Sequence, residues 1–207
     1  MVCEEKVWRA HAAPRGDADT NLVRAAQAGS MEAFSELVRR YQDRVYTVIS
    51  GMVIAREDAL DLTQETFVKA YVGLSRFRRE AGFYTWLYRI AAHLCIDYNR
   101  KRKRRWELLS LDQCLQHDPS LEPEDRSPAS DPERAAVNVH LRATIRIALS
   151  RVTEPFRTAV ILHDVEGLSQ EEVARIMNCP RGTAKSRIQR GRYLLRDLLR
   201  PFVQPEA

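Results

Sequence analysis

The sequence predicts an all-α protein made of two helical domains and a flexible acidic linker. Apolar residues recur with a period of about 3.6 residues over most of the chain before residue 106 and after residue 135, as in amphipathic helices. Between these segments Pro, Ser, Asp and Glu are frequent and offer little apolar surface to bury. The C-terminal part also carries a Ser-x-x-Glu helix start, a turn and a second amphipathic segment, which together are typical of a helix-turn-helix.

Charge is distributed unevenly along the 207 residues. Residues 112–134 contain seven acids and two arginines, which gives this stretch a charge of −5; because the total is +5, the rest of the chain carries +10. Two basic modules joined by an acidic tether indicate a nucleic-acid partner. We therefore expect an N-terminal tail (1–19), a first domain (20–106), a linker (107–134) and a second domain (135–207).

Composition argues against several classes of protein. No window approaches about 18 uncharged apolar residues, so no membrane insertion is predicted, and the charged N-terminus lacks the apolar core of an export signal. The four cysteines form no Cys-x-x-Cys pair, which favours free thiols and predicts no metal site. Since no phosphate-cradling glycine loop or nucleophile arrangement occurs, the sequence predicts neither a cofactor nor an enzyme.

The first domain is expected to begin with two helices. A short helix is predicted from Asn21 to Gly29, with Asp19 or Thr20 as its N-cap and Gly29 at its end. A longer helix follows, and its periodic apolar stripe is expected to lie in the core. The residues of this stripe are Phe34, Leu37, Val38, Tyr41, Val45, Val48, Ile49 and Met52.

A third helix, predicted from about Glu57 to Ser75, has an apolar and a polar face. The side chains expected in the core are those of Leu60, Phe67, Tyr71 and Leu74. The side chains expected to face outward are those of Asp61, Gln64 and Glu65. Spacing alone leaves open whether this polar face is simply solvated or docks on another protein.

Aromatic and basic residues alternate in the next segment, a loop from Arg76 to Gly82 followed by a helix from Phe83 to Lys101 or beyond. One face of this helix is predicted to carry Trp86, Arg89, His93, Asp97 and Arg100. Base–aromatic stacking stabilises by roughly 1–3 kcal/mol per base, so the segment is suited to unstacked nucleic acid. The alternative is a helix with a core face and a solvated cationic face. The uninterrupted basic run from Arg100 to Arg105 favours phosphate binding.

The second domain is expected to contain four helices. Helices at Val139–Arg151 and Pro155–Gly167 precede a helix that starts with a capping box formed by Ser169 and Glu172. The string NCPRG then turns the chain into a long second helix, whose polar side chains suit base edges unless this face is merely solvated. The side chains near its start are those of Thr183, Lys185, Ser186, Arg187, Gln189 and Arg190.

Four strings resemble a known family. DLTQETF (61–67), FRREAGFYTWLYRIA (77–91) and IDYNRKRKRR (96–105) resemble region 2 of the bacterial extracytoplasmic-function (ECF) sigma factors of the sigma-70 family. Within that family the likeness is to the envelope-stress, sigma-E-like group. LSQEEVARIMNCPRGTAKSRIQRGRYLLRDLLR (168–200) resembles sigma region 4. The resemblance implies a region 2 helical bundle in the first domain and a region 4 helix-turn-helix in the second.

The resemblance also implies site residues, carried over position by position. Those expected to dock on the β′ clamp helices of core RNA polymerase are Asp61, Leu62, Gln64 and Glu65. Those expected to contact −10 DNA are Arg76, Phe77, Arg78, Arg79, Phe83, Tyr84, Trp86, Arg89, His93, Asp97 and Arg100. Those expected to contact −35 DNA are Thr183, Lys185, Ser186, Arg187, Gln189 and Arg190.

The implied function is that of an alternative sigma factor, which binds core RNA polymerase through its β′ and β subunits, reads −35 and −10 promoter elements and melts the −10 DNA. A stress response, control by an anti-sigma factor and a free monomer are also implied. So is a cytoplasmic location, in which the anti-sigma factor could hold the chain at the membrane. The alternative is a stand-alone helix-turn-helix regulator, which would bind DNA as a dimer without polymerase.

Overall fold

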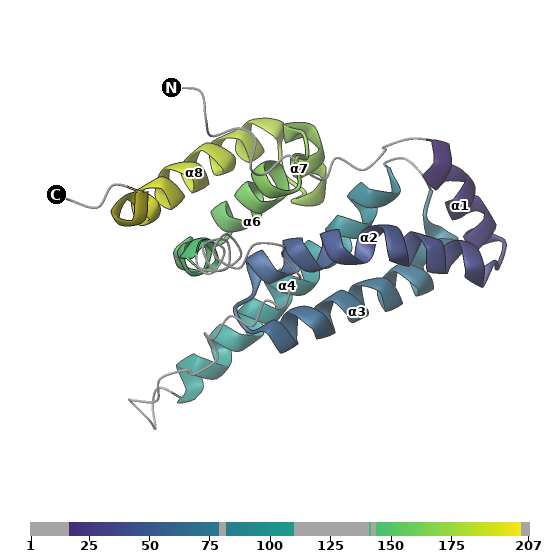
Figure 1. Ribbon diagram of the computed structural model, residues 1–207, viewed down its shortest axis with the longest axis horizontal. Helices are drawn as coiled ribbons and strands as arrows, with labels where there is room; N and C mark the ends of the chain where they lie inside the picture. Colours follow the sequence, from purple (N-terminus) through teal and green to yellow (C-terminus); the bar gives the residue numbers. More distant parts are fainter. Residues whose placement is uncertain (1–16, 79–81, 110–140, 142–143, 204–207) are drawn as a thin grey trace, which may run out of the picture.

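The computed structural model describes residues 17–78, 82–109, 141 and 144–203, and every regular element in these ranges is helical (Figure 1). A first lobe comprises α1 (Asp17–Gln27), α2 (Met31–Met52), α3 (Arg56–Gly73), the 3₁₀ turn η1 (Leu74–Arg76) and α4 (Phe83–Leu109). A second lobe comprises a helix at 144–151, α6 (Phe156–Val160), the π-helical turn η2 (Ile161–Val165), α7 (Gln170–Ile176) and α8 (Arg181–Val203). The predicted all-α fold is confirmed. The expected linker lies outside the described residues, except for 107–109 at the end of α4.

Helix α1 meets α2 through a buried carboxylate. The predicted cap at Asp19 or Thr20 is wrong, because α1 already begins at Asp17 and Asp19 lies inside it. The buried Asp19 carboxylate accepts a hydrogen bond from the Tyr41 hydroxyl of α2, and its Oδ1 lies 3.3 Å from Nη1 of Arg40. A buried charge needs such partners, so Asp19 fastens α1 to α2 instead of capping a helix.

The turn between α1 and α2 follows common cap chemistry. Gly29 has a φ of +100°, a left-handed conformation that glycine adopts without a Cβ clash. Ser30 then caps α2, because its hydroxyl accepts a hydrogen bond from the backbone N–H of Ala33 at 3.1 Å. The predicted core stripe of α2 is confirmed, with Val38 half-buried and the other seven residues buried.

The predicted core face of α3 is confirmed only in part: Phe67 and Leu74 are buried, but the other two predicted residues are not. Leu60 and Tyr71 are 44% and 49% exposed, although the sequence pattern placed both in the core. The residues that α3 buries are Ala59, Leu62, Thr63, Thr66, Phe67 and Ala70. The hydroxyls of Thr63 and Thr66 each donate 2.7 Å hydrogen bonds to a carbonyl one turn earlier, so both can be buried without water.

Helix α4 begins at Phe83, as predicted. Among the described residues it is the longest helix. It has 27 residues and contacts α2 and α3 of its own lobe. Asn99 on α4 donates a 3.1 Å hydrogen bond to the carbonyl oxygen of Met52, at the end of α2. Among the described residues, no helix has the length and apolar content needed to cross a membrane.

The second lobe contains the predicted helix-turn-helix. Its capping box is confirmed: Ser169 accepts from the backbone N–H of Glu172 at 3.3 Å, and Glu172 accepts from that of Ser169 at 2.7 Å. Asn178, with a φ of 48°, then turns the chain towards α8. Helix α8 crosses α6 at Gly191, where an added Cβ would lie 2.7 Å from the carbonyl oxygen of Phe156. Only glycine permits this close approach.

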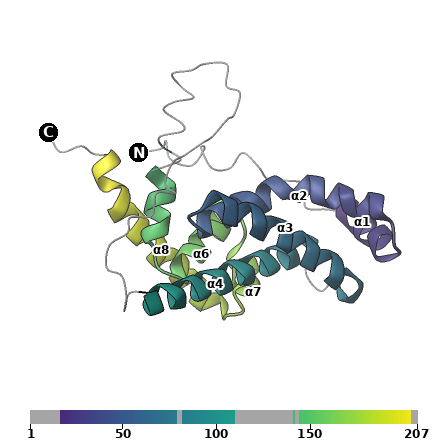
Figure 2. The same ribbon diagram turned by 90° about the horizontal axis from the view of Figure 1, so that it is seen from below.

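The two lobes touch along α2–η2 and α4–α7 (Figures 1 and 2). One cluster of buried apolar residues runs through both lobes. At the contact, the carboxylate of Glu166 is paired with the Arg44 guanidinium of α2. The Tyr88 hydroxyl of α4 donates to the same carboxylate at 2.5 Å. Glu166 is only 8% exposed, so the second lobe supplies a buried charge that two helices of the first lobe satisfy.

Candidate functional site

The outer face of α3 carries most of the residues expected to dock on polymerase. Asp61, Gln64 and Glu65 are exposed, and Glu65 pairs with Lys69 one turn later at 3.0 Å. The prediction for Leu62 is wrong: its side chain is 7% exposed and packs in the core, so it does not lie on this surface. Apolar side chains on the face come instead from other positions of the same helix.

Two valines extend this face, and sequence reasoning missed both. Val68 and Val72 are 62% and 74% exposed, and they follow Asp61 by seven and eleven residues on the same side of α3. That spacing was the signal that could have found them. Acids at one end and exposed apolar side chains at the other make a surface that can form both ion pairs and apolar contacts with a protein.

A cavity of about 350 Å³ opens between α3 and α4 beside this face. It is lined by Lys69, Gly73, Arg76, Trp86, Ile90, His93, Leu94 and Asp97. Four of these, Arg76, Trp86, His93 and Asp97, belong to the set expected to contact −10 DNA. The structure therefore brings together an indole ring, an imidazole, two cations and one carboxylate around one hollow, where the indole ring can stack on a base.

Buried aromatic rings hold Trp86 at the cavity. Its ring stacks on Phe77 with centroids 4.8 Å apart and lies 5.8 Å from that of Phe83. Phe77 and Phe83, which were expected to contact DNA, are 8% and 5% exposed. The prediction that these two rings contact DNA is therefore wrong, because both lie in the core. Burying such large apolar rings stabilises the fold, and their contacts with the Trp86 ring hold it in position.

Other residues expected at the −10 site lie away from the cavity. Tyr84 and Arg89 face the second lobe: the Tyr84 hydroxyl donates to the Glu172 carboxylate, and Nη2 of Arg89 donates to the carbonyl oxygen of Arg175 at 2.9 Å. Arg78 is exposed after η1. Arg79 lies outside the described residues.

The basic run continues along α4 beyond the cavity. Arg100 pairs with Asp97 one turn earlier, and both side chains are more than half exposed. The following positions 101–105 are exposed except for the half-buried Arg102. The run therefore forms the cationic end of a rigid helix, where it can meet phosphates.

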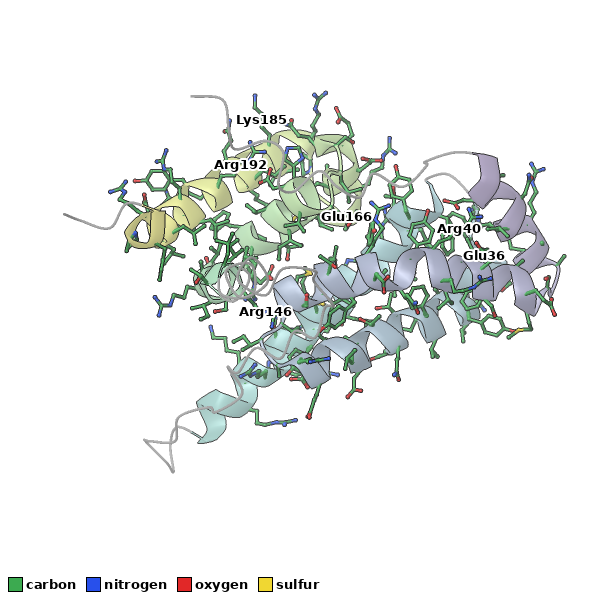
Figure 3. The ribbon with its side chains drawn as sticks, viewed as in Figure 1. Glu36, Arg40, Arg146, Glu166, Lys185 and Arg192 are labelled. Atoms are coloured by element: carbon green, nitrogen blue, oxygen red, sulfur yellow. The ribbon has the colours of Figure 1, made fainter. Side chains whose placement is uncertain are left out.

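The helix-turn-helix presents most of its predicted reading residues to solvent. Lys185, Ser186, Gln189 and Arg190 are exposed on α8, while Thr183 and Arg187 are half-buried. Figure 3 shows Lys185 on the side of α8 away from α2. Ala184 and Ile188 of the same helix are buried. The helix therefore has a packed face and a polar face, which is the arrangement of a recognition helix.

An exposed aromatic on α8 was also missed. Tyr193 is 47% exposed, and the guanidinium carbons of Arg190 and Arg196 lie 5.5 and 5.1 Å from its ring centre. Arginines three residues before and after a tyrosine share its face of the helix, which was the available signal. The ring limits the orientations of Arg190 at the edge of the polar face.

Comparisons with known proteins agree with this geometry. The family model described as Sigma-70 region 2 matches residues 37–105, and that described as Sigma-70, region 4 matches residues 142–195. The RNA polymerase sigma-H factor of Pseudomonas aeruginosa is 36% identical over 190 residues, which cover 90% of this chain and 96% of the relative. The ECF RNA polymerase sigma-E factor of Escherichia coli K12 is 36% identical over 192 residues, with 90% and 96% covered. The chain belongs to the ECF sigma factors of the sigma-70 family.

Two solved structures share the fold of this sigma factor. CnrH in complex with the cytosolic domain of CnrY has a TM-score of 0.64 and 24% identity, and the match covers 88% of this chain and 97% of that one. The sigma factor RpoE of Bartonella quintana, in complex with the anti-sigma factor NepR, also has a TM-score of 0.64 and 24% identity, with 82% and 98% covered. At this identity the likeness supports the fold alone.

As an ECF sigma factor, the chain directs transcription from promoters and is not an enzyme. The region 2 match decides against a stand-alone helix-turn-helix regulator, whose N-terminal half would be unrelated to sigma factors. The region 2 and region 4 matches fall inside the domains expected at 20–106 and 135–207. The domain boundaries themselves stay predictions, as do the individual contact residues.

Proposed function

We propose that this ECF sigma factor divides its work among three surfaces. The outer face of α3 docks on core RNA polymerase, the cavity between α3 and α4 takes an extruded −10 base, and the exposed face of α8 reads the −35 element. The observation that carries the proposal is the cavity, because it gathers Trp86, His93, Arg76 and Lys69 from separate elements beside an exposed acidic face.

For polymerase docking, the acidic part of α3 supplies hydrogen-bond acceptors for basic side chains of the β′ clamp helices. Charged contacts that lose water at an interface are strong when well aligned and costly to break on one side. The exposed Val68 and Val72 take the apolar role that Leu62 cannot fill from the core. The β subunit would be contacted by the second lobe.

For promoter melting, binding supplies the free energy. Extruding a base costs a few kcal/mol, about what stacking on one or two aromatic rings returns. Trp86 supplies such a ring at the cavity, and Arg76 and Lys69 neutralise phosphate charge beside it. The basic end of α4 from Arg100 to Arg105 binds the neighbouring phosphates.

For −35 recognition, α8 enters the major groove with its exposed polar face. Lys185 and Arg190 can donate to guanine, and Gln189 can pair with adenine. Arg187 and Thr183, which are half-buried, lie at the side of this face and suit phosphate contacts better than base contacts.

The partners follow from this assignment. Core RNA polymerase and promoter DNA are the working partners, and the chain acts as a monomer in the cytoplasm, where polymerase lies. The solved structures that share the fold contain a partner named as an anti-sigma factor or as a cytosolic domain. By this analogy we propose that an anti-sigma factor controls the chain, in keeping with a stress response.

The test is run-off transcription with purified core polymerase on a library of random promoters. Transcripts should start from templates that share two sequence elements at a fixed spacing, and their selection would also report the −10 and −35 bases. If the chain fails to stimulate transcription from any template, or binds DNA only as a dimer without polymerase, the proposal is wrong.

A further inference from the structure

A side-chain amide joins α1 to the turn that follows α3. Nε2 of Gln27, the last residue of α1, donates 2.9 Å hydrogen bonds to the carbonyl oxygens of Leu74 and Phe77. These two carbonyls stand at the start of η1 and directly after its end, 47 and 50 positions further along the sequence. Because a primary amide has two N–H donors, the Gln27 side chain commits both of them to this one turn.

The internal hydrogen bond of η1 is of the weaker 3₁₀ kind. The turn covers Leu74–Arg76 and is closed by the backbone N–H of Phe77, which donates to the carbonyl oxygen of Leu74 at 3.1 Å. Hydrogen bonds of 3₁₀ turns have poorer geometry than those of α-helices. The two bonds from Gln27 therefore add support from outside the turn.

The other end of this brace is fixed as well. Helix α1 packs against α2 and buries Val23 (Figure 1). Its buried Asp19 accepts from the Tyr41 hydroxyl and pairs with Arg40, both on α2 (Figure 3). Gln27 therefore projects from a helix that is anchored to the core of the first lobe, and it ties η1 to that helix.

The braced turn carries one side of the cavity between α3 and α4. Arg76, the last residue of η1, lines the hollow, and so does Gly73 just before the turn. An added Cβ at Gly73 would lie 3.3 Å from Cζ2 of Trp86, so the backbone runs directly against the indole ring. After the turn, the Phe77 ring stacks on the same indole with centroids 4.8 Å apart. A shift of η1 would therefore displace a cation and the support of the stacking ring together.

The brace lies away from the other two proposed surfaces. Asp61 and Glu65 precede Leu74 by thirteen and nine residues, which places them about 20 and 14 Å along the helix axis. Helix α1 contacts α2, η1 and α4 of its own lobe, whereas α8 belongs to the second lobe. Loss of the brace should therefore affect the cavity and spare polymerase docking and −35 binding.

We propose that Gln27 is a positioning residue for the −10 cavity, holding η1 so that Arg76 and the Trp86 ring meet one extruded base. This inference rests on the proposed function and deepens it, because it gives α1, which contacts no partner in that proposal, a part in promoter melting. Gln27 acts through the turn and touches no DNA itself.

The experiment uses the complex of the full chain with core polymerase and the −10 strand selected by transcription, labelled for fluorescence anisotropy. An abasic site is moved along the strand, and the position with the largest loss of binding to the parent complex marks the extruded base. Removing that base should weaken parent binding about tenfold, equivalent to one lost stacking contact. In Gln27→Met, which keeps the side-chain length without donors, the same removal should weaken binding by about twofold or less, because the base no longer meets an ordered ring.

Asn99→Leu is the matched control. Asn99 also donates from a side-chain amide to a backbone carbonyl of the first lobe, that of Met52 at 3.1 Å, but it is not among the residues that line the cavity. This variant should keep the base dependence of the parent. If Gln27→Met also keeps it, or if both variants lose it equally, Gln27 only stabilises the first lobe and the proposal is wrong.

A second variant separates lost hydrogen bonds from a changed fold. Gln27→Lys keeps N–H donors on a flexible side chain of similar reach and should restore most of the base dependence. Thermal unfolding followed by circular dichroism sets a temperature at which every variant is folded. Equal base dependence in Gln27→Lys and Gln27→Met would show that hydrogen bonding does not hold the turn, and would overturn the proposal.

Polymerase association and −35 duplex binding complete the comparison, and both should be unchanged in Gln27→Met. A loss of either as large as the loss of −10 binding would contradict a role confined to the cavity. If the positioning fails alone, the parent complex will still show one sensitive abasic position and Gln27→Met will share it. If the proposed function fails, the parent complex will show no such position and will start no transcripts, which would overturn both.

Discussion

At the residue scale, the side chains proposed to touch partners depend on buried neighbours. Trp86 lines the cavity because Phe77 stacks beneath it and Phe83 lies at its edge. On α3, Asp61 is exposed because Leu62 beside it is buried and fixes the rotation of the helix. A substitution therefore tests a contact only if it leaves such supports in place.

Asp61→Ala should weaken association with core polymerase while DNA contacts stay intact. The exposed carboxylate is expected to lose water at the interface, so its removal should cost about 1–2 kcal/mol, between the values for exposed and for buried ion pairs. Surface-immobilised core polymerase provides the measurement. Asp43→Ala, at an exposed position of α2, is the control and should bind like the parent chain; equal losses in both variants would contradict the docking face.

Arg190→Ala should weaken binding of the −35 duplex by about 1–3 kcal/mol and relax selectivity at one base pair. The reason is that Arg190 is exposed on the reading face of α8, with Tyr193 limiting its orientations. Anisotropy with the duplex selected in the transcription experiment measures the change. Arg200→Ala, near the far end of the same helix, should have little effect beyond one phosphate contact. Unchanged selectivity in Arg190→Ala would remove this residue from the base-reading set.

Cys95 should make stability fall in alkali. Burial, with the Glu154 carboxylate as a smaller cause, raises the pKa of this thiol from 9.0 to about 12. The unfolded thiol ionises first, so the contribution is complete below pH 9 and is lost as the pH rises towards about 12, by up to about 1.4 kcal/mol per unit. Urea unfolding across this range should give a shallower decline for Cys95→Ala; parallel declines would show that another group dominates.

At the element scale, the packing of α8 on α6 depends on a single missing side chain. An added Cβ at Gly191 would lie 2.4 Å from Cγ2 of Val160 and 2.7 Å from the carbonyl oxygen of Phe156. The backbone atom cannot move aside as a side chain can. The recognition helix is therefore held at the distance that glycine sets.

Gly191→Ala should destabilise the second lobe by about 1–3 kcal/mol through overpacking. Gly182→Ala is the matched control on the same helix, because its Cβ would meet nothing within 4 Å. That control should be neutral or more stable by up to about 1 kcal/mol, since alanine favours helix. Thermal unfolding followed by circular dichroism compares the two; similar melting temperatures would mean that α8 can shift away from α6.

Sequence periodicity predicted the elements well where large apolar residues mark the core. It found the stripe of α2 and the capping box of α7. It failed on α3, where the buried face consists largely of Ala59, Thr63, Thr66 and Ala70. Small residues, and threonines whose hydroxyls bond to their own helix, differ little in hydrophobicity from exposed positions, so the pattern wrongly placed the larger Leu60 and Tyr71 in the core, although Phe67 and Leu74 are buried as predicted.

At the scale of the whole molecule, the contact between lobes could not be read from the sequence. Arg44 and Glu166 are 122 positions apart and look like ordinary surface charges within their own helices. Only the fold brings them together. The sequence also could not show that two residues of the predicted −10 set contact the second lobe. Tyr84 and Arg89 match the family pattern, yet both form hydrogen bonds with α7.

The chain should unfold as one cooperative unit, because buried apolar residues of both lobes form a single cluster. Scanning calorimetry should show one transition for the parent chain. Glu166→Gln, which removes the charge shared across the boundary, should split it into two. One transition in both proteins would mean that the apolar contacts alone couple the lobes, and two in the parent would mean that the coupling is weak.

The length of α4 has a consequence for promoter geometry. The helix is unbroken from Phe83 to Leu109, so the cavity residue His93 and the last arginine of the basic run, Arg105, ride on one rod. Twelve residues of helix span about 18 Å, the length of roughly five stacked base pairs. Under the proposed function, this rod would fix the spacing between the base-binding cavity and the phosphates bound by the basic run, so that spacing would be the same on every promoter.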